Sequence, residues 1–182
     1  TVDNVTSRYN LGAAFSIDIA STYKSNIEFM NQPIVNNNGL NGVVVSYNYF
    51  GYGGCGGIST NRNWYNYVPY ILSTLGNCSM TVDAEVRPQP GTIIKFPVGT
   101  KLVVNQNLIA EGTEQDPIYF TSLKDDSAGL ENHPEWRDDD GNCIAGLACD
   151  TNADGSATSP APGDWNQITF NTDCSNGCRP AT

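Results

Sequence analysis

Short β-prone segments separated by turn residues constrain this chain more than any other feature. Between residues 58 and 123 such segments recur and no helical period comes between them. Proline and glycine break the pattern repeatedly, and both residues interrupt strands and favour turns. This pattern is typical of a β-solenoid, in which each strand stacks on the next coil, or of an ordinary sandwich, and spacing alone does not separate the two. The segments are Tyr70–Leu72, Met80–Val86, Thr92–Phe96, Lys101–Val104, Asn107–Ala110 and Pro117–Ser122.

Residues 1–57 show a different pattern and are predicted to form a small β-rich N-terminal unit. Three segments in it are apolar or alternating, and Asn-Gly steps between them favour tight turns. The glycine-rich stretch Gly51–Gly57 is predicted to be a hinge, so we place a boundary between 1–57 and 58–182. The three segments are Ala14–Ala20, Asn26–Met30 and Gly42–Phe50.

The charge of the chain excludes several classes of partner. Nineteen acidic residues against nine basic ones give a net charge of −10. This charge argues against nucleic acid and anionic membrane as partners, since both repel an acidic protein. No apolar run reaches the ~18 residues that a membrane-spanning helix needs. The only histidine, His133, disfavours a metal site built from several histidines.

The acidity lies in one stretch, which predicts a calcium-binding loop at 124–164. Residues 111–173 contain 14 acids and 2 bases, a net of −12, whereas the rest of the chain has 5 acids and 7 bases, a net of +2. Asp150, Asn152 and Asp154 supply oxygen side chains at alternate positions, followed by Gly155, as at the start of an EF-hand loop. Ser156 would add a backbone carbonyl.

Other residues must complete such a calcium site, because position 12 of the loop is alanine and not the usual glutamate. The candidates for the missing ligands are Asp125, Asp126 and Asp164. A second cluster of the same chemistry is Asp138, Asp140 and Asn142. The alternative is an acidic, solvated loop without metal.

Six cysteines indicate an oxidising compartment. Of the 15 possible pairings, proximity in sequence favours Cys55–Cys78, Cys143–Cys149 and Cys174–Cys178. The chain begins at Thr1, and we expect a mature secreted protein from which a signal peptide has been removed. Sequons at Asn4 and Asn77 would permit glycosylation.

A series of short motifs runs along residues of about 58–170: Trp64, Pro69–Leu72, Pro90–Phe96, Leu102–Val104, Leu108–Thr113, Pro117–Ser122, Lys124–Asp126, Asp150–Gly155 and Gly163–Trp165. Taken together, these residues resemble the right-handed parallel β-helix modules of secreted bacterial cell-surface proteins. The resemblance implies an all-β fold, a short parallel β-helix after the small N-terminal unit. It also implies an extracellular or cell-surface location, because such modules occur in adhesins and other envelope proteins. The segment Leu130–Cys149 departs from the family pattern and resembles an insertion.

Our functional hypothesis is a secreted structural subunit that assembles head to tail into a filament or surface layer. A short solenoid exposes unpaired strand edges, and a donated N-terminal strand from 1–20 would satisfy them. The apolar residues of that strand are Val2, Val5, Phe15, Ile17 and Ile19, on a segment with no evident local partner.

Two alternatives remain: a calcium-dependent carbohydrate-active β-helix enzyme, and a carbohydrate-binding or adhesive module of a larger surface protein. A cluster of aromatic residues between Tyr47 and Tyr70 would suit cell-surface polysaccharide, a subunit contact or an internal packing seam. The chain has neither a GxSxG nor an HExxH motif, and we predict that it is not an enzyme. A lyase could use Arg62, Arg87 or Arg137, but snorkelling or pairing with surface acids is the favoured role of these arginines.

Overall fold

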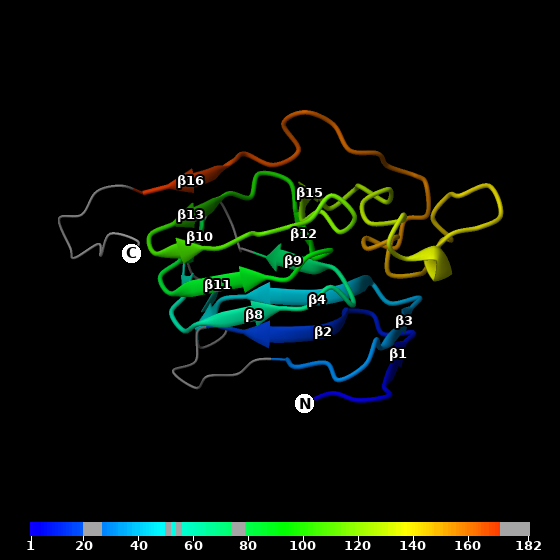
Figure 1. Ribbon diagram of the computed structural model, residues 1–182, viewed down its shortest axis with the longest axis horizontal. Coiled ribbons are helices and arrows are strands. Elements are labelled where there is room, and N and C mark those ends of the chain that lie inside the picture. Colours follow the sequence, from blue (N-terminus) through cyan, green and yellow to red (C-terminus); the bar gives the residue numbers. More distant parts are fainter. Residues whose placement is uncertain (20–26, 50–51, 54–55, 74–78, 172–182) are drawn as a thin grey trace.

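The protein folds as a parallel β-solenoid of about four turns, with very little helix. The computed structural model describes residues 1–19, 27–49, 52–53, 56–73 and 79–171. Strands from successive turns lie side by side in Figure 1, and the long loops between β15 and β16 gather beside them. The all-β, parallel β-helix prediction is therefore confirmed. No helix among these residues has the length and apolar character needed to cross a membrane.

Three parallel sheets form the walls of the solenoid. The largest has the strand order β15-β12-β9-β4-β2, and the other two have the orders β16-β13-β10-β7 and β14-β11-β8. The first sheet consists of β2 (Ala13–Asp18), β4 (Leu40–Ser46), β9 (Tyr70–Ser73), β12 (Ile93–Phe96) and β15 (Tyr119–Ser122). The second consists of β7 (Gly57–Ile58), β10 (Met80–Val82), β13 (Leu102–Val104) and β16 (Ile168–Phe170). The third consists of β8 (Arg62–Trp64), β11 (Glu85–Pro88) and β14 (Asn107–Leu108).

The remaining elements are short. Strands β1 (Thr6–Arg8) and β3 (Ile34–Asn36) form a parallel pair, and β5 (Asn48–Tyr49) and β6 (Tyr52–Gly53) an antiparallel one. One turn of 3₁₀ helix, η1 (Pro134–Trp136), lies in the long loop after β15.

The core consists of columns of side chains stacked from turn to turn. Parallel pairing in register places equivalent residues of successive strands above one another, so one inward position repeats through the sheet. In the first sheet such a column contains Ile17, Val45, Leu72 and Phe96, all at most 5% exposed. The inward-facing residues of successive strands thus form one continuous apolar core, which includes Ile94 and Phe96 of β12.

The N-terminal residues continue this solenoid across the predicted boundary at residue 57. Strand β4 pairs with β9 over four residues, and Ile17 belongs to the same core cluster as Phe96. Gly57 begins strand β7, where an added Cβ would lie 1.9 Å from the Thr81 hydroxyl oxygen. Gly57 therefore permits the close stacking of β7 on β10.

The N-terminal strand has a partner within its own chain, which corrects the premise of the donor-strand prediction. Strand β2 pairs with β4, and Ile17 and Ile19 are buried. Phe15 packs edge-on against Phe29 with ring centroids 5.3 Å apart. Val2 forms a bridge with the backbone of Phe29, while Val5 is 37% exposed. Apolar alternation is the same in a donated strand and in a strand that folds back, so the sequence pattern alone did not separate them.

A loop layer, defined as residues 123–165, covers the outer face of the first sheet. Its own small apolar cluster includes Ile93, the outward neighbour of Ile94 on β12, together with Ala128, Trp136 and Ala148. The predicted disulfide between Cys143 and Cys149 is present, with the two Cα atoms 5.9 Å apart. The other four cysteines and the sequon residue Asn77 lie outside the described residues, whereas Asn4 is exposed.

The aromatic residues that the structure describes between Tyr47 and Tyr70 mostly pack inward. Trp64 and Tyr70 are almost fully buried and stack with centroids 5.1 Å apart. The hydroxyl of Tyr70 accepts a hydrogen bond from the backbone N–H of Tyr65. Of the three roles considered for this aromatic cluster, these contacts fit an internal packing seam, because a buried ring cannot contact a sugar.

Candidate metal centre

Three acidic side chains converge in the loop layer. Asp126, Asp150 and Asp154 each have a carboxylate oxygen within 4.8 Å of the others. Asp126 follows β15 directly, whereas Asp150 and Asp154 come from the other end of the loop layer, beyond the disulfide. Among the described residues no other group of three or more histidine, cysteine or acidic side chains lies so close together.

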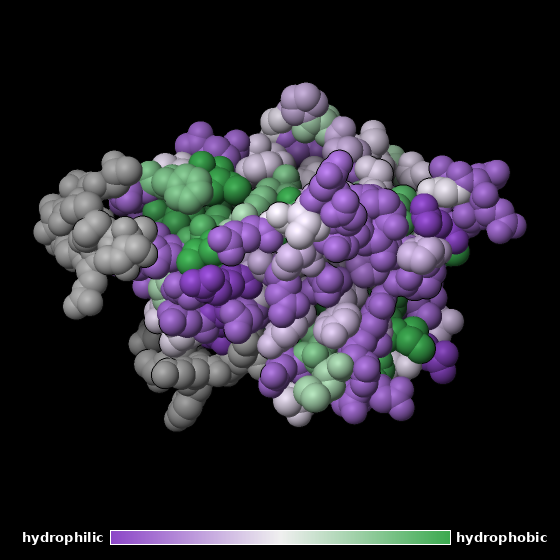
Figure 2. Space-filling view, viewed as in Figure 1, coloured by the Kyte–Doolittle hydropathy of each residue, from purple (hydrophilic) through white to green (hydrophobic). Residues whose placement is uncertain are grey.

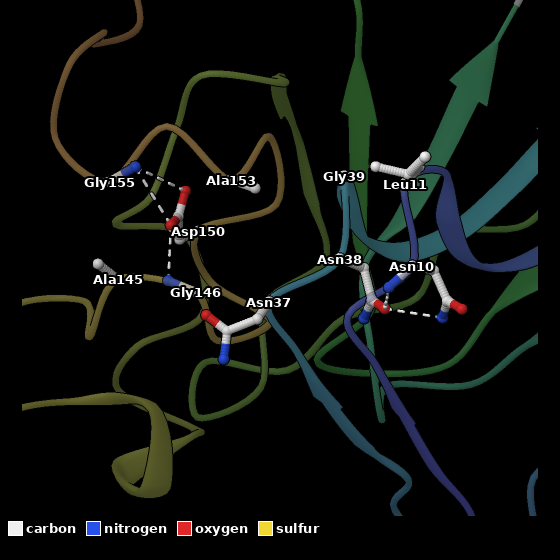
Figure 3. Close-up of a pocket in the computed structure, with 10 residues that line it drawn as sticks. All are labelled: Asn10, Leu11, Asn37, Asn38, Gly39, Ala145, Gly146, Asp150, Ala153 and Gly155. Carbon is white, nitrogen blue, oxygen red and sulfur yellow. Dashed lines mark hydrogen bonds between the residues drawn. The ribbon is translucent and has the colours of Figure 1, made fainter.

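Asp150 is the buried centre of this cluster, with 1% of its surface exposed. Its carboxylate accepts hydrogen bonds from the backbone N–H groups of Gly146 at 2.7 Å and Gly155 at 3.2 Å (Figure 3). A third hydrogen bond comes from the backbone N–H group of Asp154 at 3.0 Å. Gly155 has φ +66°, a conformation that glycine adopts without strain. The predicted turn after Asp154 thus forms as the sequence indicates, and it wraps the backbone around one carboxylate.

Three buried oxygens in this region have no hydrogen-bond donor. They are Oδ1 of Asp126, Oδ1 of Asn152 and Oδ1 of Asp154. The other oxygen of Asp154 accepts hydrogen bonds from the Asn152 amide at 2.8 Å and from the Thr158 hydroxyl at 2.5 Å, which fixes the side chain. Buried oxygens without donors are costly, and an all-oxygen set of carboxylates and amide is the donor set that Ca²⁺ prefers. The residues present therefore fit a calcium ion.

Lys95 supplies a positive charge beside the cluster. The side chain is fully buried on the outer face of β12, and its ammonium group donates a hydrogen bond to the Cys149 carbonyl at 2.9 Å. Burial lowers the pKa of Lys95 to about 8, although Asp126, Asp125 and Asp150 favour its charged form. With these carboxylates ionised the local charge stays negative despite Lys95, and a divalent cation would reduce it.

The surroundings of Asp126 disfavour its ionised form. Burial raises the pKa of Asp126 to about 6, and the charges of Asp150 and Asp154 add to this effect while Lys95 opposes it. A pKa raised in this way shows that the folded protein disfavours the third negative charge. A bound cation would reverse that preference.

The other predicted ligands of this site lie elsewhere or have other partners. Asp125 accepts hydrogen bonds from Ser127 and Thr121, and Ser156 is exposed. Asp164 forms an ion pair with Lys124 at 2.8 Å and accepts a hydrogen bond from Ser122, so it ties the end of the loop layer to β15.

The second predicted cluster does not form a group of this kind. Asp138 accepts hydrogen bonds from the backbone N–H groups of Asp140 and Asn142, which closes a tight turn. The side chains of Asp138 and Asp140 are exposed, so water can solvate them.

A pocket of about 460 Å³ joins the loop layer to the first turns of the solenoid. Figure 3 shows Asn10, Asn38 and Asp150 around it. Asn38 is 2% exposed and accepts hydrogen bonds from Asn10, while Asn41 donates to the Asp150 carbonyl at 2.9 Å. Sequence analysis did not identify these asparagines as neighbours of Asp150, because they precede it by more than a hundred positions.

Comparison with family models, curated proteins and solved structures finds no match for this chain. The parallel β-solenoid is therefore established by the sheet topology alone.

Proposed function

We propose that this protein is a secreted structural subunit that assembles head to tail through the ends of its solenoid. One core column carries the proposal. Ile58, Val82 and Val104 occupy equivalent positions of β7, β10 and β13 and are 0%, 0% and 2% exposed. Phe170 continues the column on β16 and is 62% exposed. This core column thus ends in an exposed apolar side chain at the last described strand.

The surface around this end is suited to a further layer of strands. Figure 2 shows apolar surface gathered over β13 and β16. Within the described residues β15 and β2 are the two outer strands of the five-stranded sheet, so each pairs on one side only. A second copy that places its β2 against β15 would continue the same parallel sheet. Such contacts do not close on themselves and generate a filament.

Burial of the open end supplies the driving force. Full burial of a phenylalanine side chain is worth about 1.5–3 kcal/mol, and strand pairing satisfies a row of backbone groups at the same time. The Cys143–Cys149 disulfide supports an extracellular setting, since disulfides persist in oxidising compartments.

Replacing Phe170 tests the assembly. Phe170→Asp places a charge in the contact and should abolish concentration-dependent assembly in sedimentation velocity and electron micrographs. Val98→Asp is the matched control, because Val98 is 70% exposed but lies in a turn outside the sheets. A protein that stays monomeric at high concentration, or Phe170→Asp that assembles like the unmodified chain, refutes the proposal. Deletion of residues 1–20 is a poor test, because it would remove β2 from the core.

We also propose that the subunit binds Ca²⁺ at Asp126, Asp150 and Asp154, with Asn152 as a further ligand. The donor set and the negative local charge support this assignment. Binding to the folded state alone would raise the free energy of unfolding by about 2.7 kcal/mol at a calcium concentration 100 times Kd.

Isothermal titration and thermal unfolding with calcium or chelator test this site. Asp154→Asn should weaken calcium binding and remove the thermal shift, whereas Asp138→Asn should bind like the unmodified protein. A melting temperature that chelator leaves unchanged, or equal binding by both variants, rules the site out.

A further inference from the structure

Arg62 is a buried residue whose guanidinium Nε has no hydrogen-bond partner. The residue is the first of strand β8 and is 5% exposed, and its Nε is fully buried without a hydrogen-bond acceptor. The other arginine on this wall of the solenoid, Arg87 of β11, is exposed and forms an ion pair with Glu85 at 2.6 Å. Among the described residues no acidic side chain forms an ion pair with Arg62.

The strand geometry aims this guanidinium inward. Asn61 and Asn63 are exposed, while Arg62 and Trp64 are buried, so Arg62 lies on the inner face of β8. It pairs in register with Val86, a fully buried core residue of β11. A surface arginine would instead extend its charge into water.

A second orphaned polar group lies close by in the sequence. The hydroxyl oxygen of Thr60 is buried without a partner, in the bend that leads into β8, two residues before Arg62. Two residues span at most about 7 Å of chain, so the hydroxyl and the guanidinium group belong to one short stretch of backbone.

The chain offers little that could neutralise this charge. Arginine remains protonated in proteins, and an uncompensated buried charge costs several kcal/mol. The segments outside the described residues contain a single acid, Asp173. Burial lowers the pKa of Arg62, as expected for a cation without a counter-charge.

We propose that Arg62 and Thr60 form a binding site for a small carboxylate. A carboxylate has two coplanar oxygens that match the guanidinium fork, and the Thr60 hydroxyl can donate a third hydrogen bond. The low exposure of Arg62 selects a small anion over the side chain of a folded partner. This site is separate from the acidic cluster and does not depend on the assembly proposal.

Acetate is the probe for this site. The intact ¹⁵N-labelled protein is titrated with sodium acetate at constant ionic strength, with sodium chloride as the reference, and the Nε–Hε signal of Arg62 is followed by NMR. Arg62→Lys assigns the signal, because lysine keeps the charge but has no Nε. The expected result is a saturable shift with acetate that chloride does not produce.

Variants then separate binding from a merely structural role. Loss of charge-assisted hydrogen bonds should weaken acetate binding about 10-fold or more in Arg62→Met, and Thr60→Val should weaken it less. Arg87→Met, on the neighbouring strand, should bind as the unmodified chain does. If Arg62→Met does not fold, the titration of the unmodified protein still decides.

Two results would overturn the proposal. The first is an Arg62 signal that acetate does not move beyond the effect of chloride. The second is an Asp173→Asn variant that is destabilised as much as Arg62→Met while the unmodified protein ignores acetate. That outcome would show that the chain neutralises Arg62 internally.

Discussion

Because Lys95 is fully buried, we expect the free energy of unfolding to rise with pH in the alkaline range. Burial lowers the pKa of its ammonium group from 10.5 to about 8 in the folded protein. Between these two pH values the unfolded chain holds a proton that the folded protein has lost. Because stability rises with pH wherever the unfolded state binds more protons, the free energy of unfolding should increase from pH 8 towards pH 10.5.

The size of the increase follows from the shift itself. Each pKa unit corresponds to about 1.4 kcal/mol, so the whole contribution is about 3 kcal/mol. Most of it should be visible by pH 10. Lys95→Met keeps the length of the buried side chain and removes the titrating group, so this variant should lack the increase. Methionine also lacks the hydrogen bond to the Cys149 carbonyl, which changes stability at every pH. The effect of the charge is therefore measured by how the free energy of unfolding changes with pH, and not by its value at one pH.

Urea unfolding at intervals from pH 7 to pH 10, with chelator present throughout, measures the effect. Lys101→Met is the matched control, because Lys101 is a partly exposed lysine at the start of the next turn. Lys101→Met should show the same rise in the free energy of unfolding between pH 8 and pH 10 as the unmodified protein. A flat profile for the unmodified protein, or the same rise in Lys95→Met, would show that the folded protein does not bury the charge in this way.

Three further predictions concern the loop layer. Asp150→Ala leaves three backbone N–H groups without their charged acceptor and should lower the free energy of unfolding by about 3 kcal/mol or more. Asp150→Asn should lower it less. A loss for Asp150→Ala below about 1 kcal/mol in urea unfolding would contradict this prediction. Replacing Cys143 and Cys149 together by serine should cost about 2 kcal/mol, from the loop entropy regained by the unfolded chain, and calorimetry with and without reductant should agree with the variant. The hydrogen bond from Lys124, with those from the Ala161 N–H group and Ser122, lowers the pKa of Asp164 to about 2, so stability should fall as pH drops from 4 to 2; Asp164→Asn should show a shallower fall in acid unfolding, and an equal fall would exclude this role.

The local pattern of the sequence was sufficient to predict an all-β chain of short strands, whereas the parallel solenoid was implied by the family resemblance. Short β-prone runs and frequent proline and glycine predict many brief strands, and the strands β9, β12 and β15 lie where the runs Tyr70–Leu72, Thr92–Phe96 and Pro117–Ser122 indicate. The pairing of Cys143 with Cys149 was equally accessible, because six residues separate them and nearby cysteines meet easily. The Asp150–Gly155 turn also forms locally, through hydrogen bonds between residues at most five positions apart.

Contacts between distant residues had to come from the tertiary structure. Whether residues 1–57 form a separate unit depends on whether β4 pairs with β9. Apolar alternation predicts which face of a strand is buried, but it does not predict which strand lies beside it. Asp126 and Asp150 meet only because the loop layer folds back over β12, and Lys95 and Arg62 are buried only because other turns cover them. The sequence by itself determined where strands and turns occur, since backbone propensity and steric freedom act within a few residues. Tertiary structure alone decided which strands stack and which charges lose water, since burial is a property of everything packed around a side chain.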